Sequence, residues 1–180
     1  MNCALVLGIG NPYISDDGVG IYVVRELRKR IQDSRIEYRE EVSGGLDILH
    51  RLRKYDEAVL IDAAKTGSIP AGQLLTIPLF NFSSPHLSRN SSLSQPLSLH
   101  TLGITASISL GSMLGLTVPV HVTIFAVEVN DTETFHEGCT PRVNAAIPAI
   151  TDEILVYLLS KMPDLHCLHH FEKDRSAYDA

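Results

Sequence analysis

The stretch Leu5 to Gly20, LVLGIGNPYISDDGVG, decides how this chain folds. Its first residues belong to an apolar run, Cys3 to Leu7, that is typical of a fully buried strand. Turn-forming residues follow from Gly8 to Pro12, so the strand ends in an irregular loop. After Gly18, apolar residues recur at helical spacing: Val19, Tyr22, Val23, Leu27 and Ile31. Two adjacent acids therefore lie between a buried strand and an amphipathic helix.

These acids are Asp16 and Asp17. In an open α/β sheet, ligands bind in the crevice outside the carboxyl ends of the strands, which is where both acids fall. Aspartate is also common before helices, because its side chain accepts hydrogen bonds from free backbone N–H groups and its charge suits the helix dipole. Capping explains one of the two acids, for which Asp16 is the better candidate. The other acid then needs another reason.

Composition indicates an ordinary globular protein. The chain has 180 residues, of which 44% are apolar and 20% charged. No run approaches the roughly 18 uncharged apolar residues of a membrane helix, and the N-terminus lacks a basic region, so we expect a cytoplasmic protein. A net charge of -6 argues against nucleic acid or an anionic membrane as partner. Three widely spaced cysteines with no C-x-x-C pair suggest neither a disulfide framework nor a thiolate zinc site.

Apolar segments then alternate with amphipathic ones along the chain. Strands are predicted at 35–42, at 57–61 ending at Asp62, at 73–79 closed by Pro78, and at 118–129. Helices are predicted at 46–52 with Ser43 as the cap, at 102–114, and at 143–158 after Pro141. A serine-rich stretch at 81–98 is expected to be a mobile surface loop.

This alternation predicts an α/β fold. We expect a three-layer α/β/α sandwich around a central, largely parallel or mixed sheet of about five strands. No repeat or linker divides the chain, so residues 1–162 should form a single domain, followed by a polar C-terminal tail at 163–180.

Two strand-end acids and one histidine are the candidate functional residues. If the strands beginning at Cys3 and Glu57 are neighbours in a parallel sheet, Asp17 and Asp62 emerge at the same edge, and His100, before a helix, can reach it. Carboxylate and imidazole donors suit a divalent first-row metal such as nickel or zinc, with at least one position left open. Many aspartates at strand ends only cap backbone groups, and many histidines only pack against other side chains. The residues alone therefore leave open whether these three bind metal or have a structural role.

Three motifs resemble those of a known family. They are GIGNPYISDDGVG at 8–20, LIDA at 60–63 and LHTLG at 99–103. Their order and spacing are similar to those of the hydrogenase maturation endopeptidases, which process the C-terminus of the [NiFe]-hydrogenase large subunit. The resemblance implies that Asp17, Asp62 and His100 bind metal. Asp17 and Asp62 are also the candidate catalytic carboxylates.

The resemblance also implies a narrow reaction. One peptide bond near the C-terminus of the immature large subunit would be cut after nickel insertion, releasing a short extension. The nickel would be carried by the substrate, with no cofactor permanently bound, and zinc or cadmium could stand in for it. The expected protein is a monomer whose partner is the immature large subunit, with no nucleic acid or membrane. Two mechanisms stay open: a carboxylate acting as general base in an aspartic-type reaction, and nickel polarising the scissile carbonyl.

The chain departs from the family after its second predicted strand. Many members have Asp-Gly-Gly-Thr there, whereas this chain has EEVSGG at 40–45. Glu40 is the nearest counterpart of the family's acid. The predicted substrate-binding residues are Asp16, Glu40, Ser43, Gly44 and Gly45. We also expect the serine-rich loop to order around the C-terminal peptide of the substrate.

Other interpretations remain. The same metal ligands would serve a nickel-sensing escort that binds the hydrogenase subunit and cuts nothing. The Gly8 to Pro12 motif also resembles peptidyl-tRNA hydrolases, which place a histidine where this chain has its acid pair and need a basic face. Tyr13 occupies the third glycine position of a dinucleotide-binding motif. His86 is a substitute candidate for His100, and we expect only incidental metal binding by the tail residues His166, Cys167, His169 and His170.

Overall fold

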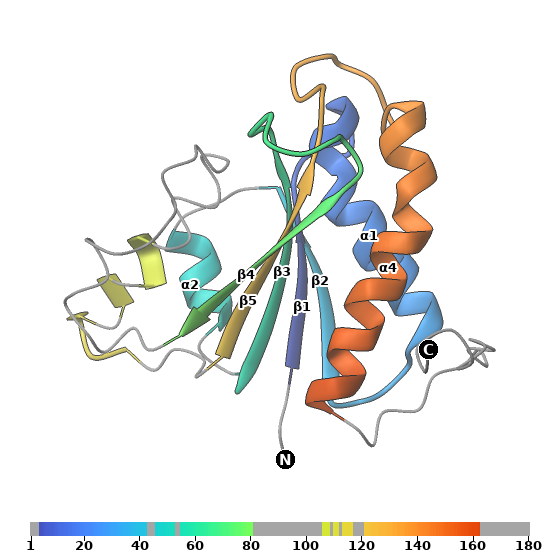
Figure 1. The fold of residues 1–180 in the computed structure, drawn as a ribbon. Helices are drawn as coiled ribbons and strands as arrows, with labels where there is room; N and C mark the ends of the chain where they lie inside the picture. The colour runs from blue at the N-terminus through green and yellow to red at the C-terminus, as the bar shows by residue number, and fades with distance from the viewer. Residues whose placement is uncertain are drawn as a thin grey trace.

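A five-stranded mixed sheet forms the centre of the molecule, in the order β2-β1-β3-β5-β4 (Figure 1). This computed structural model describes residues 4–42, 46–52, 55–80, 106–108, 110–111, 113–116 and 121–162. Four strands run parallel to one another: β1 (Ala4–Ile9), β2 (Ile36–Glu41), β3 (Glu57–Ala64) and β5 (His121–Glu128). The fifth, β4 (Leu74–Phe80), lies at the edge and runs antiparallel to β5.

Helices cover both faces of this sheet. Helices α1 (Val19–Arg30) and α4 (Pro141–Lys161) lie side by side on one face, and α2 (Leu46–Leu52) lies on the other (Figure 1). Side chains alternate between the two faces, so Val6 of β1 packs with α1 and α4, whereas Leu5 packs with α2 and with Ile108. The predicted three-layer α/β/α sandwich is confirmed.

Several strand boundaries differ from the prediction. Strand β1 continues through Gly8 to Ile9 instead of ending at Leu7. Strand β3 does not end at Asp62 but continues to Ala64, because its last three residues pair with β5, Asp62 lying opposite Ala126. Pro78 does not close β4 but lies within it, opposite Thr123. A proline is tolerated there because β4 is an edge strand, which needs backbone donors on one side only.

Helix α4 agrees with its prediction and supplies much of one core layer. Its buried residues are Val143, Ile150, Thr151, Ile154, Leu155 and Leu158. By length and composition alone, α4 is also apolar enough to cross a membrane, a property that core helices of globular proteins share. Here it packs against α1 and the sheet.

Several predictions lie outside the described residues. These are the serine-rich loop at 81–98, the tail at 163–180, the capping role of Ser43 and the first part of the helix predicted at 102–114. Residues 106–108 of that helix are helical, and Ile108 is fully buried against the same face as α2. The division into a domain at 1–162 and a tail therefore stays a prediction.

Candidate active site

The carboxyl ends of β1 and β3 form one edge of the sheet, and the predicted catalytic acids Asp17 and Asp62 lie near it. The strands are parallel neighbours, with Gly8 of β1 opposite Ile61 of β3, so Asp62 follows at the level of Ile9. Adjacent strands lie about 4.8 Å apart. The chain leaves β1 at Gly10 and returns over this edge in a 3-10 turn, η1 (Ser15–Gly18), before α1 begins.

Two glycines allow this close return. A Cβ atom on Gly10, whose φ is +132°, would lie 1.8 Å from the carbonyl oxygen of Asp17. A Cβ atom on Gly20 would lie 2.3 Å from the carbonyl oxygen of Ile61 and 2.5 Å from that of Ile9. Only glycine fits at either position, so the glycines bring η1 directly onto the ends of β1 and β3.

Asp17 is half-buried at this edge. Its Oδ2 atom accepts a hydrogen bond of 2.7 Å from the backbone N–H of Asn11 and lies 3.6 Å from the Cβ position of Gly10. The carboxylate is therefore held over the end of β1 with part of its surface open to solvent.

Asp62 lies on the neighbouring strand and is fully buried. One of its carboxylate oxygens accepts a hydrogen bond of 2.9 Å from the N–H of Ala63. Its neighbours Ile61 and Ala63 pack with α1 and α4, so the alternation of β3 directs Asp62 to the opposite face, where Leu60 packs with α2 and Ile108. The helix that follows His100 in sequence thus covers the face to which Asp62 points.

The remaining predicted metal and substrate residues are described only in part. His100, Ser43, Gly44 and Gly45 lie outside the described residues. Among the residues that are described, no group of three or more His, Cys, Asp or Glu side chains could hold a metal ion. The set Asp17, Asp62 and His100 therefore stays a prediction, with Asp17 in the turn η1 and Asp62 in β3.

Asp16 has a structural role in addition to any contact with substrate. It is fully buried, and its carboxylate accepts hydrogen bonds from three backbone N–H groups: Asn130 at 3.3 Å, Asp131 at 3.2 Å and Thr140 at 2.7 Å. These residues lie in the loop between β5 and α4, not in the helix that Asp16 precedes. The predicted capping of the following helix by Asp16 is wrong, because its carboxylate accepts hydrogen bonds from a segment that is distant in sequence.

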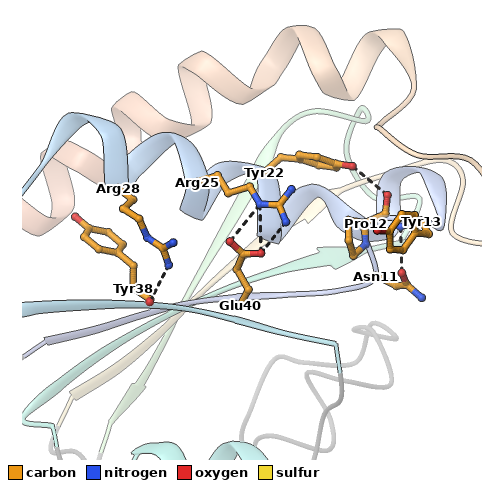
Figure 2. A network of polar contacts seen from close by, with 8 residues as sticks. All are labelled: Asn11, Pro12, Tyr13, Tyr22, Arg25, Arg28, Tyr38 and Glu40. Carbon is orange, nitrogen blue, oxygen red and sulfur yellow. Dashed lines mark hydrogen bonds and ion pairs between the residues drawn. The ribbon is translucent and has the colours of Figure 1, made fainter.

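Glu40 is joined to α1 by an ion pair. Its carboxylate accepts hydrogen bonds from Nε and Nη2 of Arg25, the shorter being 2.8 Å, and this pairing raises the pKa of Arg25 (Figure 2). The Arg25 guanidinium also lies 5.7 Å from the centre of the Tyr22 ring, whose hydroxyl donates a hydrogen bond of 3.0 Å to the carbonyl oxygen of Pro12. A continuous set of contacts thus connects Glu40 to the loop that carries Asp17.

The loop between β5 and α4 is hydrogen-bonded to the segment that carries Asp17. The sequence did not predict this contact. Ser15, at φ 43°, donates its N–H to the carbonyl oxygen of His136 at 2.8 Å, and the N–H of His136 bonds the carbonyl oxygen of Tyr13 at 3.0 Å. The only signal in the sequence is the polar run at 130–140, which has no periodicity from which a partner can be inferred.

Cys139 belongs to this loop but is not an activated nucleophile. It is partly buried against the core layer of α1 and α4. Burial, with a further contribution from the charge of Asp16, raises the pKa of Cys139 to about 12. The thiol therefore stays protonated at neutral pH. Only the deprotonated thiolate attacks a carbonyl carbon efficiently, so Cys139 is a poor nucleophile.

Known proteins similar to this chain are named for the formation or maturation of hydrogenases. No protein-family model matches. The chain is 27% identical over 155 residues to hydrogenase expression/formation protein HupD of Thiocapsa roseopersicina, covering 86% of this chain and 66% of that protein. It is also 27% identical over 155 residues to the Hydrogenase 2 maturation protease of Escherichia coli K12, covering 86% of this chain and 89% of that protein. The chain is therefore similar to hydrogenase maturation proteases.

Solved structures agree in fold. The hydrogenase maturating endopeptidase HybD from E. coli superposes with a TM-score of 0.71 at 24% identity, covering 92% of this chain and 96% of that chain. The [NiFe] hydrogenase maturation protease HybD from Thermococcus kodakarensis gives a TM-score of 0.62 at 17% identity, covering 87% and 98%. The chain therefore shares the fold of these solved structures.

Proposed function

We propose that this protein is an endopeptidase that removes the C-terminal extension of an immature [NiFe]-hydrogenase large subunit after nickel has been inserted. The observation that carries the proposal is the similarity to the E. coli Hydrogenase 2 maturation protease over 89% of that protein's length. The site agrees with it, because Asp17 lies in the turn over the end of β1 and Asp62 lies near the end of the neighbouring parallel strand β3. This edge of an α/β sheet is where ligands bind.

The two carboxylates differ in access, and this suggests an order of events. Asp17 is half-buried and can meet the nickel-bearing end of the large subunit directly. Asp62 is fully buried, so the chain around it must move before it can contact the same ion. We assign His100, which precedes the helix covering the face of Asp62, as the third ligand. In this scheme nickel belongs to the substrate, and zinc or cadmium in the substrate could replace it in binding.

The bond cleavage can be driven by either of two groups. A carboxylate, with Asp17 the more accessible, can accept a proton from the attacking water as a general base. Alternatively, the nickel carried by the substrate polarises the scissile carbonyl. A thiol mechanism is disfavoured by the pKa of Cys139 of about 12.

The test follows the mass of the substrate. The purified protein is mixed with an unprocessed large subunit in its nickel-loaded and nickel-free forms, and both are followed by mass spectrometry. We expect loss of a C-terminal fragment from the nickel-loaded form only, and no loss with Asp17→Asn or His100→Ala. Val156→Ser, an exposed change on α4, is the matched control and should cleave normally.

A non-catalytic escort is the second candidate. The same three ligands would serve a protein that binds the nickel-loaded subunit without cutting it. Stable binding with no change of mass would establish the escort and reject the endopeptidase. The peptidyl-tRNA hydrolase alternative is not favoured, because the named relatives are hydrogenase maturation proteins.

We further propose that the protein acts in the cytoplasm as a monomer, because its substrate is another protein that must reach the strand ends without obstruction. Light scattering of the purified protein tests the monomer. A dimer that persists at nanomolar concentration would reject it.

A further inference from the structure

Two aromatic side chains stand exposed beside the candidate active site. Tyr13 is 54% exposed and Phe135 is 84% exposed, although phenylalanine is among the residue types most often buried. Tyr13 lies in the loop that leads from β1 to Asp17 (Figure 2). Phe135 lies in the loop between β5 and α4.

Backbone pairing brings these two loops together. Ile14 and His136 form an isolated parallel bridge, in which the N–H of His136 bonds the carbonyl oxygen of Tyr13 at 3.0 Å. Phe135 immediately precedes His136, so both aromatic residues flank the bridge. Asp17 follows Ile14 by one turn, and its N–H bonds the carbonyl oxygen of Ile14 at 2.9 Å. The aromatic pair and the accessible carboxylate are therefore parts of one platform.

The platform is fixed in place by two other carboxylates. Asp16 holds the N–H groups of Asn130 and Asp131, as described above. The side chain of Asp131 accepts hydrogen bonds from the N–H groups of Glu133 at 3.1 Å and Thr134 at 3.0 Å. Hydrogen bonds to the side chains of Asp16 and Asp131 therefore fix the backbone just before Phe135. The exposed ring of Phe135 extends from this ordered segment. Ordered, exposed aromatic side chains are the kind of residue that dominates protein–protein binding energy.

The loop that carries Phe135 is acidic. The loop at 130–140 contains Asp131, Glu133 and Glu137 and no lysine or arginine. Lys65, after β3, lies 3.7 Å from Glu133 and is the basic residue paired with this loop. A partner that covers the platform should therefore present an apolar side chain flanked by lysine or arginine.

We infer that Tyr13 and Phe135 form a docking surface for the hydrogenase large subunit, which they bind through an apolar side chain flanked by basic residues near the bond to be cut. This inference rests on the proposed function. Two other occupants fit the charges poorly. An anionic lipid surface would be repelled by the three acids. A second copy of this chain, itself of net charge -6, would bring the same acidic loop against this one.

The experiment compares Tyr13→Ser, Phe135→Ser and the double variant with wild type, with Val156→Ser as the matched exposed control on α4. Steady-state processing of the nickel-loaded large subunit gives KM and kcat, and biolayer interferometry gives the affinity for the same subunit. We expect the double variant to raise KM and Kd at least about tenfold while kcat stays within about twofold, since docking residues contact the partner and not the reacting bond. Added salt should raise the wild-type KM.

The outcomes separate this inference from the proposed function. Unchanged KM and Kd in the double variant, with wild-type processing intact, would overturn the docking surface and leave the endopeptidase standing. If the wild type binds but does not cut, the endopeptidase fails, and the Kd of the double variant alone decides the docking surface. An equal loss of affinity in Val156→Ser would also overturn it.

Discussion

The carboxylate of Asp16 accepts a hydrogen bond of 2.7 Å from the backbone N–H of Thr140, the residue that precedes α4. The bond joins the turn after β1 to a segment 124 residues further along the chain. Its neighbour Asp17 instead turns back to Asn11 and remains partly open to solvent. Of these two adjacent acids, Asp16 therefore holds the loops of the site together, and Asp17 is the one that is accessible to a substrate.

This division predicts opposite effects of two substitutions. Asp16→Ala leaves three partly buried N–H groups without their acceptor and should lower the free energy of unfolding by about 2–3 kcal/mol. Asp17→Asn should lower it by less than about 1 kcal/mol, because the amide oxygen can still accept from Asn11, yet it should abolish processing. Urea denaturation and the mass assay measure the two properties. Equal stability losses in both variants would contradict the division.

The ion pair of Arg25 and Glu40 tests whether Glu40 binds substrate. Both side chains are well exposed, so Arg25→Gln and Glu40→Gln should each change the free energy of unfolding by less than about 1 kcal/mol. If Glu40 meets the substrate, Glu40→Gln should lower kcat/KM about tenfold, while Arg25→Gln, which leaves the carboxylate in place, should lower it less. A larger loss in Arg25→Gln would show that Glu40 acts only by anchoring α1.

Much of this fold follows from local sequence patterns. The apolar runs of β1 and β5 and the helical spacing of α1 and α4 each predict their element, because burial on a sheet or helix face imposes that periodicity. The extension of β3 beyond Asp62 could not be predicted, since it depends on pairing with β5, which is distant in sequence.

The site was predictable only in part, for a similar reason. Glycine and aspartate chemistry indicates that the loop after β1 carries a site, and the parallel pairing of β1 with β3 follows from the fold class. The bridge between Ile14 and His136 and the pairing of Arg25 with Glu40 join residues with no shared periodicity. Contacts of this kind are set by tertiary packing, so one sequence gives no signal for them.

Asp131 should make the loop that carries Phe135 sensitive to acid. Hydrogen bonds from Thr134 and Glu133 lower the pKa of its carboxyl from 3.8 to about 2. A pKa that is lower in the folded state means that the charged form stabilises the loop above pH 3.8, and that this stabilisation is lost as the pH falls from 3.8 through about 2. NMR titration should show the Phe135 ring resonances shifting over this window. In Asp131→Asn, which cannot titrate, the shift should disappear; its persistence would assign the effect to another group.

Cys139 should be dispensable for cleavage. Because its pKa of about 12 keeps the thiol protonated, it should react slowly with iodoacetamide at pH 8 in a Cys3→Ser, Cys167→Ser background. Cys139→Ala should process the large subunit within about twofold of wild type. Loss of all cleavage in a folded Cys139→Ala variant would instead require a thiol mechanism.

Tyr157 should contribute stability at the far end of the sheet without affecting cleavage. Its hydroxyl donates a hydrogen bond of 2.9 Å to Glu57, which begins β3, and lies 2.7 Å from the hydroxyl oxygen of Thr123. Tyr157→Phe removes this partner from the buried Glu57 carboxylate and should lower the free energy of unfolding by about 1–3 kcal/mol, with processing unchanged.

The same hydroxyl also predicts a pH dependence in alkali. Burial raises the pKa of Tyr157 from 10.0 to about 12, so the neutral hydroxyl stabilises the fold below pH 10, and this contribution is lost as the pH rises towards 12. Urea denaturation at pH 7, 9 and 11 should therefore show the difference between wild type and Tyr157→Phe shrinking at pH 11. Taking the difference between the two proteins cancels the titration of the other tyrosines, which is common to both. A difference that stays constant across the series would mean that the hydroxyl does not titrate differently in the folded and unfolded chains.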